Sequence, residues 1–140
     1  MKSTSYYPVL ITKQVAETRD FYIRHLDFEP AFESEWYVHL CSKADPKVNL
    51  AILEQGHPTI PESDMPMTGM ILNFEVEDVD AVYDRALTQK WSVLKPLCDE
   101  AFGQRHFIAR DPSGTLIDVI KPIPPTAEFA AQYSAAALPR

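Results

Sequence analysis

The chain repeats one order of secondary-structure elements, and this internal repeat restricts the fold more than any other feature of the sequence. Residues 6–12 have the composition of a β-strand, and a stripe of side chains at helical spacing follows them. Residues 70–76 form a second expected strand, again followed by such a stripe. The two stripes are Thr18, Phe21, Tyr22, His25 and Leu26 in the first half, and Val79, Val82, Tyr83, Ala86 and Leu87 in the second. The chain is therefore expected to contain two similar modules.

Four identical residues support an alignment of the two halves at an offset of 61 positions. The identical pairs are Val15 and Val76, Tyr22 and Tyr83, Arg24 and Arg85, and Leu26 and Leu87. Three further strands are expected after each helix, at about residues 28–33, 35–41 and 48–55, and at about 91–97, 105–110 and 115–121. Each module is thus predicted to run strand, helix, and then three strands.

The 140 residues are expected to form a single domain built from these two modules. Module 1 spans about residues 5–55, a proline-containing linker spans 56–69, and module 2 spans about 70–122. The tail, residues 123–140, is expected to form an Ala-rich helix that Thr126 caps and that ends near Leu138. Asp78 is predicted to be the N-cap of the second module's helix.

Composition and charge exclude several classes of function. The net charge of −7 disfavours nucleic acid as a partner, because such binding depends on Lys and Arg neutralising phosphates. An acidic site would instead attract a cationic ligand. The sequence has no apolar run of about 18 residues and no secretory signal, so neither a membrane span nor export is expected. With only Cys41 and Cys98, a disulfide framework is not expected, and we predict a cytoplasmic protein with two reduced thiols.

A predicted hairpin near the C-terminus carries a carboxylate in an apolar strand. Asp111, Pro112 and Gly114 indicate a tight turn, because Pro presets φ and Gly accepts a positive φ. Asp118 follows on the second strand, and alternation places it on an apolar face. A carboxylate on a buried face is costly unless it is paired, hydrogen-bonded or bound to a ligand.

The length of the loop decides which residue of the first strand faces this carboxylate. For a four-residue loop, Arg105 lies diagonal to Asp118 and shares its face with Phe107. A bulge at Gly114 would place His106 there instead of Arg105. A ligand-binding cluster and a structural ion pair are both compatible with this arrangement.

The repeat and its Asp-Pro-x-Gly hairpin resemble the vicinal oxygen chelate superfamily, which includes glyoxalase I, the bleomycin resistance proteins and the extradiol dioxygenases. The resemblance covers about residues 6–122 and is most specific at residues 19–22, 76–80 and 107–120. It implies an α+β fold of two βαβββ modules, whose curled mixed sheets enclose a concave cleft, with helices on the convex side. Residues 103–107 look most like the bleomycin resistance proteins, metal-free homodimers that sequester a cationic, aromatic-rich antibiotic.

The resemblance also implies where a metal would bind in the metal-dependent members. Four ligand positions lie on the first and last strands of the two modules, and they fall at Tyr7, near Ala51 or Ile52, near Ile71, and at Asp118. Asp118 is a clear oxygen donor, and the carboxylate of Glu54 near the second position is a doubtful one. A divalent transition metal normally has about three protein ligands or more. The resemblance therefore predicts no bound metal and no cofactor here.

Eight residues are candidates for contacts with a small-molecule ligand. They are Trp36, Tyr37, His39, Glu54, Trp91, Arg105, Phe107 and Asp118. Aromatic rings would stack on a planar or cationic ligand, and the carboxylates would supply negative charge. Each aromatic residue has an alternative role in core packing. His39 and His106 have an alternative role as acid or base groups.

Three functions are open on this basis. The leading hypothesis is a metal-free, dimeric small-molecule binder of the bleomycin-resistance type that sequesters a cationic or aromatic compound such as an antibiotic. The second is a metal-dependent glyoxalase-like lyase or isomerase, or a dioxygenase, with at least one ligand from an unexpected position. The third is a non-catalytic scaffold that kept the fold.

Overall fold

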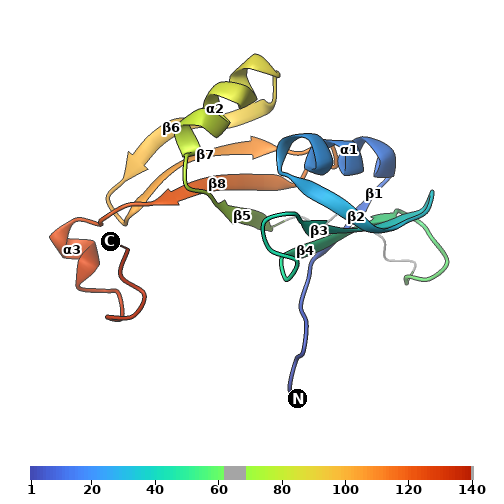
Figure 1. Cartoon of the computed structure of the whole chain (residues 1–140), viewed down its shortest axis with the longest axis horizontal. Helices are drawn as coiled ribbons and strands as arrows, with labels where there is room; N and C mark the ends of the chain where they lie inside the picture. Colours follow the sequence, from blue (N-terminus) through green and yellow to red (C-terminus); the bar gives the residue numbers. More distant parts are fainter. Residues whose placement is uncertain (62–68, 140) are drawn as a thin grey trace. The chain divides into compact units, whose positions relative to one another are not determined.

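The structure, a computed structural model, describes residues 1–61 and 69–139 (Figure 1). The middle of the expected linker lies outside these residues. The chain forms two compact units, Met1–Gly69 with Pro112–Thr115, and Met70–Asp111 with Leu116–Arg140. Each unit contains a four-stranded mixed sheet and a helix in the order βαβββ, so the predicted α+β class and module order are confirmed.

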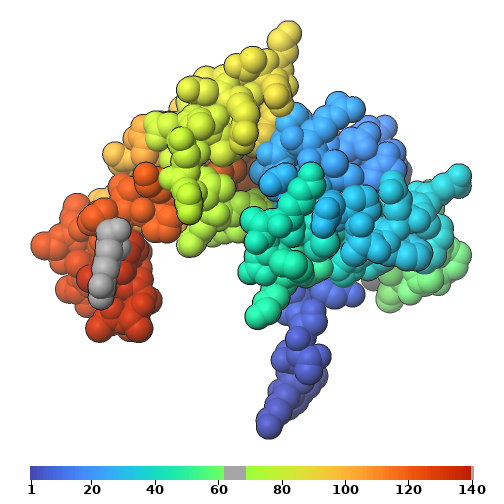
Figure 2. All heavy atoms as spheres, viewed as in Figure 1, coloured from blue at the N-terminus to red at the C-terminus, as the bar shows by residue number. Residues whose placement is uncertain are grey.

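The first unit is a sheet of order β1-β4-β3-β2 with one helix packed on it. Its elements are β1 (Val9–Thr12), α1 (Val15–His25), β2 (Phe28–Glu33), β3 (Tyr37–Ser42) and β4 (Asn49–Glu54). β1 is parallel to β4, and the other neighbours are antiparallel. Residues 1–7, ahead of β1, are exposed and extend from this unit as a narrow segment (Figure 2).

Between α1 and its sheet lies the hydrophobic core of the first unit. Tyr22 of α1 is fully buried, and its ring meets that of Phe28 edge-on at 5.9 Å. Val38 and Leu40 of β3 are also fully buried, and Ile52 of β4 pairs with Val38. Burial of such large apolar side chains stabilises a fold by roughly 1.5–3 kcal/mol each, so this face of the sheet is held firmly against the helix.

The second unit repeats the arrangement with sheet order β5-β8-β7-β6. Its elements are β5 (Ile71–Glu75), α2 (Val79–Thr88), β6 (Ser92–Glu100), β7 (Gln104–Arg110) and β8 (Leu116–Pro122). The predicted N-cap is confirmed, because the Asp78 side chain accepts a hydrogen bond from the backbone N–H of Ala81 at 3.0 Å. Phe107 and Val119 are fully buried on the side of this sheet that faces α2.

The helices show that the alignment at an offset of 61 is wrong. The N-caps Gln14 and Asp78 are 64 positions apart, as are the first buried helical residues, Val15 and Val79. A shift of three residues is close to one helical turn, so the apolar stripes still coincide and hide the error. Each helix is followed by a non-glycine residue of positive φ, Asp27 or Lys90.

The tail contains much less helix than its alanine content predicts. The helix α3 spans only Ala127–Ala130, so the expected end near Leu138 is wrong. Thr126 occupies the predicted N-cap position but makes no side-chain capping bond. A short isolated helix gains too few hydrogen bonds to offset nucleation. Instead, the hydroxyl of Tyr133 donates to the backbone carbonyl of Phe102 at 2.6 Å. Among the described residues, none of the helices has the length and hydropathy needed to cross a membrane.

Candidate functional site

Strand alternation gives each sheet a face that its helix covers and an opposite face, called here the helix-free face. In β3, the fully buried Val38 and Leu40 lie on the side of α1. Tyr37 and His39 alternate with them and lie on the helix-free face, where they are half-buried. The structure therefore shows which of the two predicted sets of β3 side chains lies on the face that α1 leaves uncovered.

A cluster of rings lies around this face of the first unit, and we call it the aromatic cluster. Its members are Tyr7, Phe32, Trp36, Tyr37 and His39, all half-buried or exposed. The rings of Tyr7 and His39 meet edge-on with centroids 4.6 Å apart. The ring of Tyr37 has neighbours on both sides, with Trp36 at 5.9 Å and Phe32 at 6.0 Å.

Polar contacts hold two of these rings in place. His39 Nε2 lies 2.9 Å from Asn49 Oδ1, which is on the adjacent strand β4. Burial raises the pKa of the Tyr37 phenol, and the neighbouring Tyr7 raises it further through charge and hydrogen bonding. The Trp36 ring stacks on the His57 ring with centroids 3.9 Å apart and planes 6° apart. The rings thus form a pre-arranged surface on which a planar molecule can stack.

In the second unit, the predicted contact between Arg105 and Asp118 is wrong. Arg110 pairs with Leu116, which leaves a five-residue connection in place of the four-residue loop assumed from the sequence. His106 and Ile108 therefore share the face of Asp118, and Arg105 lies on the other face. The alternative in which His106 replaces Arg105 describes the actual register.

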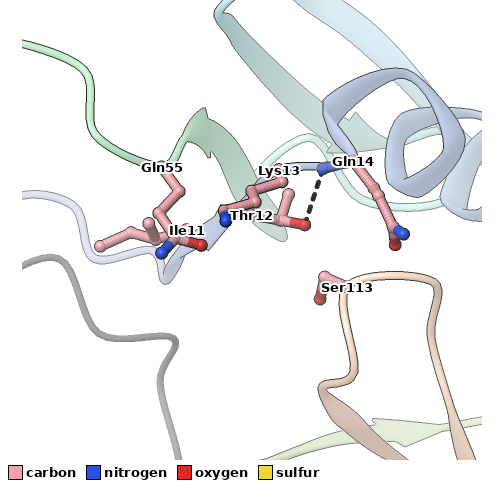
Figure 3. Close-up of a pocket in the computed structure, with 6 residues that line it drawn as sticks. All are labelled: Ile11, Thr12, Lys13, Gln14, Gln55 and Ser113. Atoms are coloured by element: carbon pink, nitrogen blue, oxygen red, sulfur yellow. Dashed lines mark hydrogen bonds between the residues drawn. The ribbon is translucent and has the colours of Figure 1, made fainter.

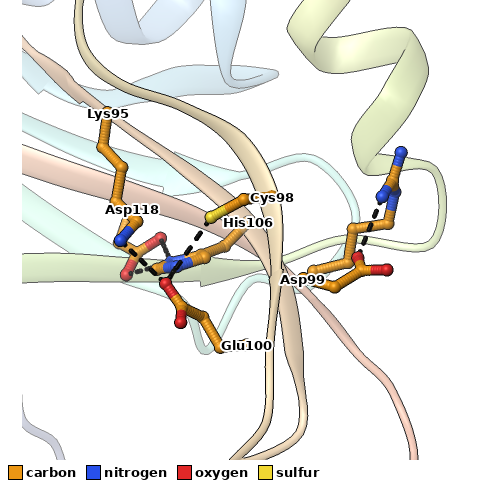
Figure 4. A network of polar contacts seen from close by, with 7 residues as sticks. Lys95, Cys98, Asp99, Glu100, His106 and Asp118 are labelled. Atoms are coloured by element: carbon orange, nitrogen blue, oxygen red, sulfur yellow. Dashed lines mark hydrogen bonds and ion pairs between the residues drawn. The ribbon is translucent and has the colours of Figure 1, made fainter.

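Asp118 belongs to a polar network on the helix-free face of the second unit. His106 Nδ1 lies 2.8 Å from Asp118 Oδ1, and both side chains are buried. His106 Nε2 lies 3.1 Å from Glu100 Oε1. The same oxygen accepts from Lys95 Nζ at 2.7 Å and from Cys98 Sγ at 3.5 Å. Figure 4 shows these side chains converging, while Asp99 points away from them.

The network perturbs the ionisation of its members. Hydrogen bonds from Lys95 and His106 lower the pKa of Glu100 to about 2. The hydrogen bond with Glu100 raises the pKa of Lys95, and so does its negative charge. Burial and Glu100 raise the pKa of the Cys98 thiol. Glu100 is therefore a carboxylate held in its charged form at the centre of the group.

Four of the eight predicted ligand residues lie away from the helix-free faces. Phe107 is fully buried against Tyr83 of α2, with ring centroids 5.1 Å apart, so it is a core residue. Trp91 contacts Phe107 with centroids 6.1 Å apart, in the same core. Arg105 pairs with Asp80 and Asp99, which makes it a structural ion-pair residue. Glu54, although exposed, follows Ile52 on the helix-covered side of β4.

Sequence reasoning missed Cys98 and Glu100 because the expected strand at residues 91–97 stopped too early, and it missed Lys95 because the strand is irregular. The strand β6 continues to Glu100, so Cys98 and Glu100 alternate onto one face. The pairing of β6 with β7 is irregular between Val93 and Cys98, so simple alternation along the strand does not predict which face carries Lys95. Only the Cys-x-Glu spacing offered a signal for this group in the sequence.

A pocket of about 200 Å³ lies beside the end of β1 (Figure 3). The hydroxyl of Thr12 accepts a hydrogen bond from the backbone N–H of Gln14 at 3.0 Å in its wall. Its lining residues are Ile11, Thr12, Lys13, Gln14, Gln55 and Ser113. None of these is a predicted site residue, and they offer neither an aromatic ring nor a carboxylate.

The residues at the family's metal positions do not fit a divalent metal. Ala51, Ile52 and Ile71 carry no donor atom in their side chains. Both carboxylate oxygens of Asp118 lie within 3.0 Å of His106 Nδ1. Tyr7 is 38% exposed and packs its ring against His39. These positions therefore lack the set of donor atoms that metal chemistry would need.

The fold and these faces define a member of one large family. The chain belongs to the Glyoxalase/Bleomycin resistance protein/Dioxygenase superfamily, whose sequence profile matches residues 6–119. No curated protein sequence matches the chain.

Solved structures with the same fold include proteins from several bacteria. TioX from Micromonospora sp. ML1 is 19% identical, with a TM-score of 0.68 over 86% of this chain and 100% of that one. TnmS3, an antibiotic binding protein from Streptomyces sp. CB03234, is 20% identical, with a TM-score of 0.68 over 86% and 97% of the two chains. A superfamily member from Sphaerobacter thermophilus DSM 20745 is 19% identical, with a TM-score of 0.71 over 86% and 98%.

Proposed function

We propose that this protein is a small-molecule binder of the bleomycin-resistance type, which sequesters a cationic aromatic compound such as an antibiotic without a metal at the family's metal positions. The aromatic cluster is the observation that carries this proposal. Tyr37, His39 and Phe32 carry rings on the sheet face that the unit's own helix does not cover. The rings of Tyr7 and Trp36 contact those of His39 and Tyr37. Large exposed apolar patches are rare on monomeric proteins, and where they occur they mark interaction or ligand-binding sites.

The charge of the protein supports a cationic ligand. The net charge of −7 favours positively charged partners over anionic ones such as nucleic acid. On the helix-free face of the second unit, Glu100 already holds an ammonium group, that of Lys95, at 2.7 Å. In the first unit, a cationic ligand would gain cation–π contacts with the aromatic cluster, worth about 0.5–2 kcal/mol each.

A metal-dependent lyase, isomerase or dioxygenase is less well supported. Such chemistry requires an ion that polarises the substrate at an open coordination position. Three of the family's four metal positions fall on residues other than His, Asp, Glu or Gln: Tyr7, Ala51 or Ile52, and Ile71. The likeness to TnmS3, which binds an antibiotic, is compatible with binding without turnover, although the identity is only 20%.

Isothermal titration calorimetry against a panel of cationic aromatic antibiotics, including metal-free bleomycin and doxorubicin, tests the proposal. The titrations are performed with a chelator present, and binding of at least one compound with micromolar affinity or better is expected. Absence of binding across the panel, or binding that appears only after metal is added, would contradict the proposal. Absence of binding together with an occluded aromatic cluster would support the scaffold hypothesis instead.

A matched pair of tyrosine variants assigns the binding surface. Tyr37→Leu is expected to weaken binding about tenfold or more, because it removes a central stacking ring. Tyr83→Leu removes a ring that packs on Phe107 beneath α2, so ligand affinity should stay unchanged. Equal losses in the two variants would show that the aromatic cluster is not the binding surface.

We further propose that the protein works as a homodimer in the cytoplasm. The dimer is suggested by the likeness to the bleomycin resistance proteins, and light scattering after gel filtration would measure its mass directly. The two free cysteines, Cys41 and Cys98, suit a reducing compartment. A monomeric mass at micromolar concentration would contradict the proposed homodimer.

A further inference from the structure

We infer that Cys98, Glu100 and His106 form a binding site for a divalent transition metal, of which Zn²⁺ is the best match. Their candidate ligand atoms all lie within 4.8 Å of one another. None of these three ligands occupies one of the family's four metal positions, although Asp118, which does, contacts His106. Thiolate, imidazole and carboxylate are the three ligand types that Zn²⁺ accepts in proteins.

The backbone brings the three side chains together on one face of two adjacent strands. Cys98 on β6 pairs with His106 on β7, and Glu100 follows Cys98 by two residues. Because side chains two apart on a strand share a face, the thiol and the carboxylate both point toward the imidazole (Figure 4). The site is thus built on strands, which hold ligands more rigidly than loops do.

The two distances from Glu100 Oε1 to the other donor atoms are close to those of a tetrahedral zinc site. With Zn–N and Zn–O bonds of about 2.1 Å and Zn–S of about 2.3 Å, neighbouring ligand atoms lie about 3.4–3.6 Å apart. His106 Nε2 lies 3.1 Å from Glu100 Oε1, and Cys98 Sγ lies 3.5 Å from the same oxygen. Small movements of these side chains would therefore accommodate an ion.

Asp118 provides an independent indication. Histidines that bind metals almost always donate their other ring N–H to a carboxylate or carbonyl, which fixes the tautomer. In this chain His106 Nδ1 faces both oxygens of Asp118, at 2.8 and 3.0 Å, so Nε2 is directed toward Cys98 and Glu100. Asp118 would therefore act as a positioning residue for the metal ligand His106.

Lys95 is the competitor for this site. Its ammonium lies 2.7 Å from Glu100 Oε1 and thus holds a positive charge where the ion would bind. The Lys95 side chain is 43% exposed, so it can turn into solvent when a metal enters. The thiol proton of Cys98 would leave for solvent at the same time, because only the thiolate is a metal ligand.

Titration with Co²⁺, which occupies zinc sites and absorbs light, tests the inference on the intact chain. Binding to one site per chain should give a thiolate-to-cobalt charge-transfer band in the near ultraviolet and strong visible bands typical of four-coordinate cobalt. Zn²⁺ added afterwards should abolish both signals. Absence of the charge-transfer band at saturating Co²⁺ would overturn the inference.

One matched pair of variants and one single substitution locate the ion. Cys98→Ser should remove the charge-transfer band, whereas Cys41→Ser, at the half-buried thiol of the first unit, should leave it intact. Lys95→Gln should tighten cobalt binding by about tenfold or more, because it removes a like charge at close range. A band that survives Cys98→Ser, or an affinity unchanged by Lys95→Gln, would contradict the site as described.

The inference stands independently of the proposed function. Antibiotic binding is measured with a chelator present, whereas metal binding is measured without any organic ligand. Loss of either result therefore leaves the other proposal intact.

Discussion

The carboxylate of Asp118 and the imidazole of His106 form a buried pair, with Nδ1 2.8 Å from Oδ1 and 3.0 Å from Oδ2. The pair explains how an otherwise apolar strand tolerates a charged residue, since a buried carboxylate must be hydrogen-bonded or paired. It also orients the second ring nitrogen toward Glu100 and Cys98.

Replacing Asp118 by Leu should destabilise the protein by about 1–3 kcal/mol, because the buried Nδ1 of His106 loses its partner. The free energy of unfolding from urea denaturation at neutral pH measures this. Asp99→Asn is the control, because its ion pair with Arg105 is exposed and should contribute little. A Leu variant as stable as the wild type would show that the pair does not support the fold.

Phe107→Ala should be the most destabilising substitution of a predicted ligand residue, at about 3–5 kcal/mol, because the ring is fully buried. The milder Phe107→Leu should stay folded and bind ligand with unchanged affinity. Thermal denaturation and calorimetric titration of the same sample separate the two effects. Weaker ligand binding in a Phe107→Leu protein that remains folded would restore this residue to the binding surface.

Arg105 makes stability depend on pH on the acid side. Its hydrogen bond and charge lower the pKa of Asp80 below the ordinary value of 3.8. A carboxylate whose pKa is lowered by folding contributes its full stabilisation above the ordinary, unfolded-state pKa of 3.8. This contribution is lost as the pH falls through the lower pKa of the folded state. Arg105→Gln should therefore show a shallower loss of stability below about pH 3.8 than the wild type.

The measurement is the midpoint of urea denaturation at several pH values between 5 and 2.5. Arg24→Gln, at an exposed position on α1, should keep the pH dependence of the wild type. Identical acid profiles for the wild type and Arg105→Gln would contradict the prediction.

Two glycine variants separate backbone strain from steric contact. Gly114→Ala should lower the free energy of unfolding by about 1–2 kcal/mol, because φ at this position is +91°. No steric contact adds to this strain, because nothing lies within 4 Å of the added methyl group. Gly103→Ala should cost more, because φ is +110° and the methyl group would also lie 3.0 Å from the carbonyl oxygen of Ile123. Differential scanning calorimetry orders the two, and the reverse order would rule out a close approach of the tail at Gly103.

Much of the fold was predictable because it rests on local patterns. The strand at Phe28–Glu33 was predicted with its observed bounds, and the cap at Asp78 also matches. The helix stripes match except at Leu87, which is exposed. Gly114 occupies the positive-φ position that its turn requires. The tail helix was not predictable from its alanines, since Tyr133 bonds to a carbonyl 31 residues away.

The candidate site was predictable only in part, because faces and registers depend on contacts that are distant in sequence. Tyr37 and His39 were predicted as a pair on one face of their strand, but only the packing of α1 on Val38 and Leu40 shows that this face is the free one. Phe107 and Trp91 have the chemistry of ligand-binding residues, yet the position of α2 makes them core.

The sequence by itself determined the order of the elements, the apolar stripes of both helices and the presence of a carboxylate in β8, since each depends on residues close together in the chain. The tertiary structure decided the partner of that carboxylate. One additional residue in the connection after Arg110 replaces Arg105 with His106 beside Asp118. Because side chains alternate along a strand, a register shift of one residue exchanges its two faces.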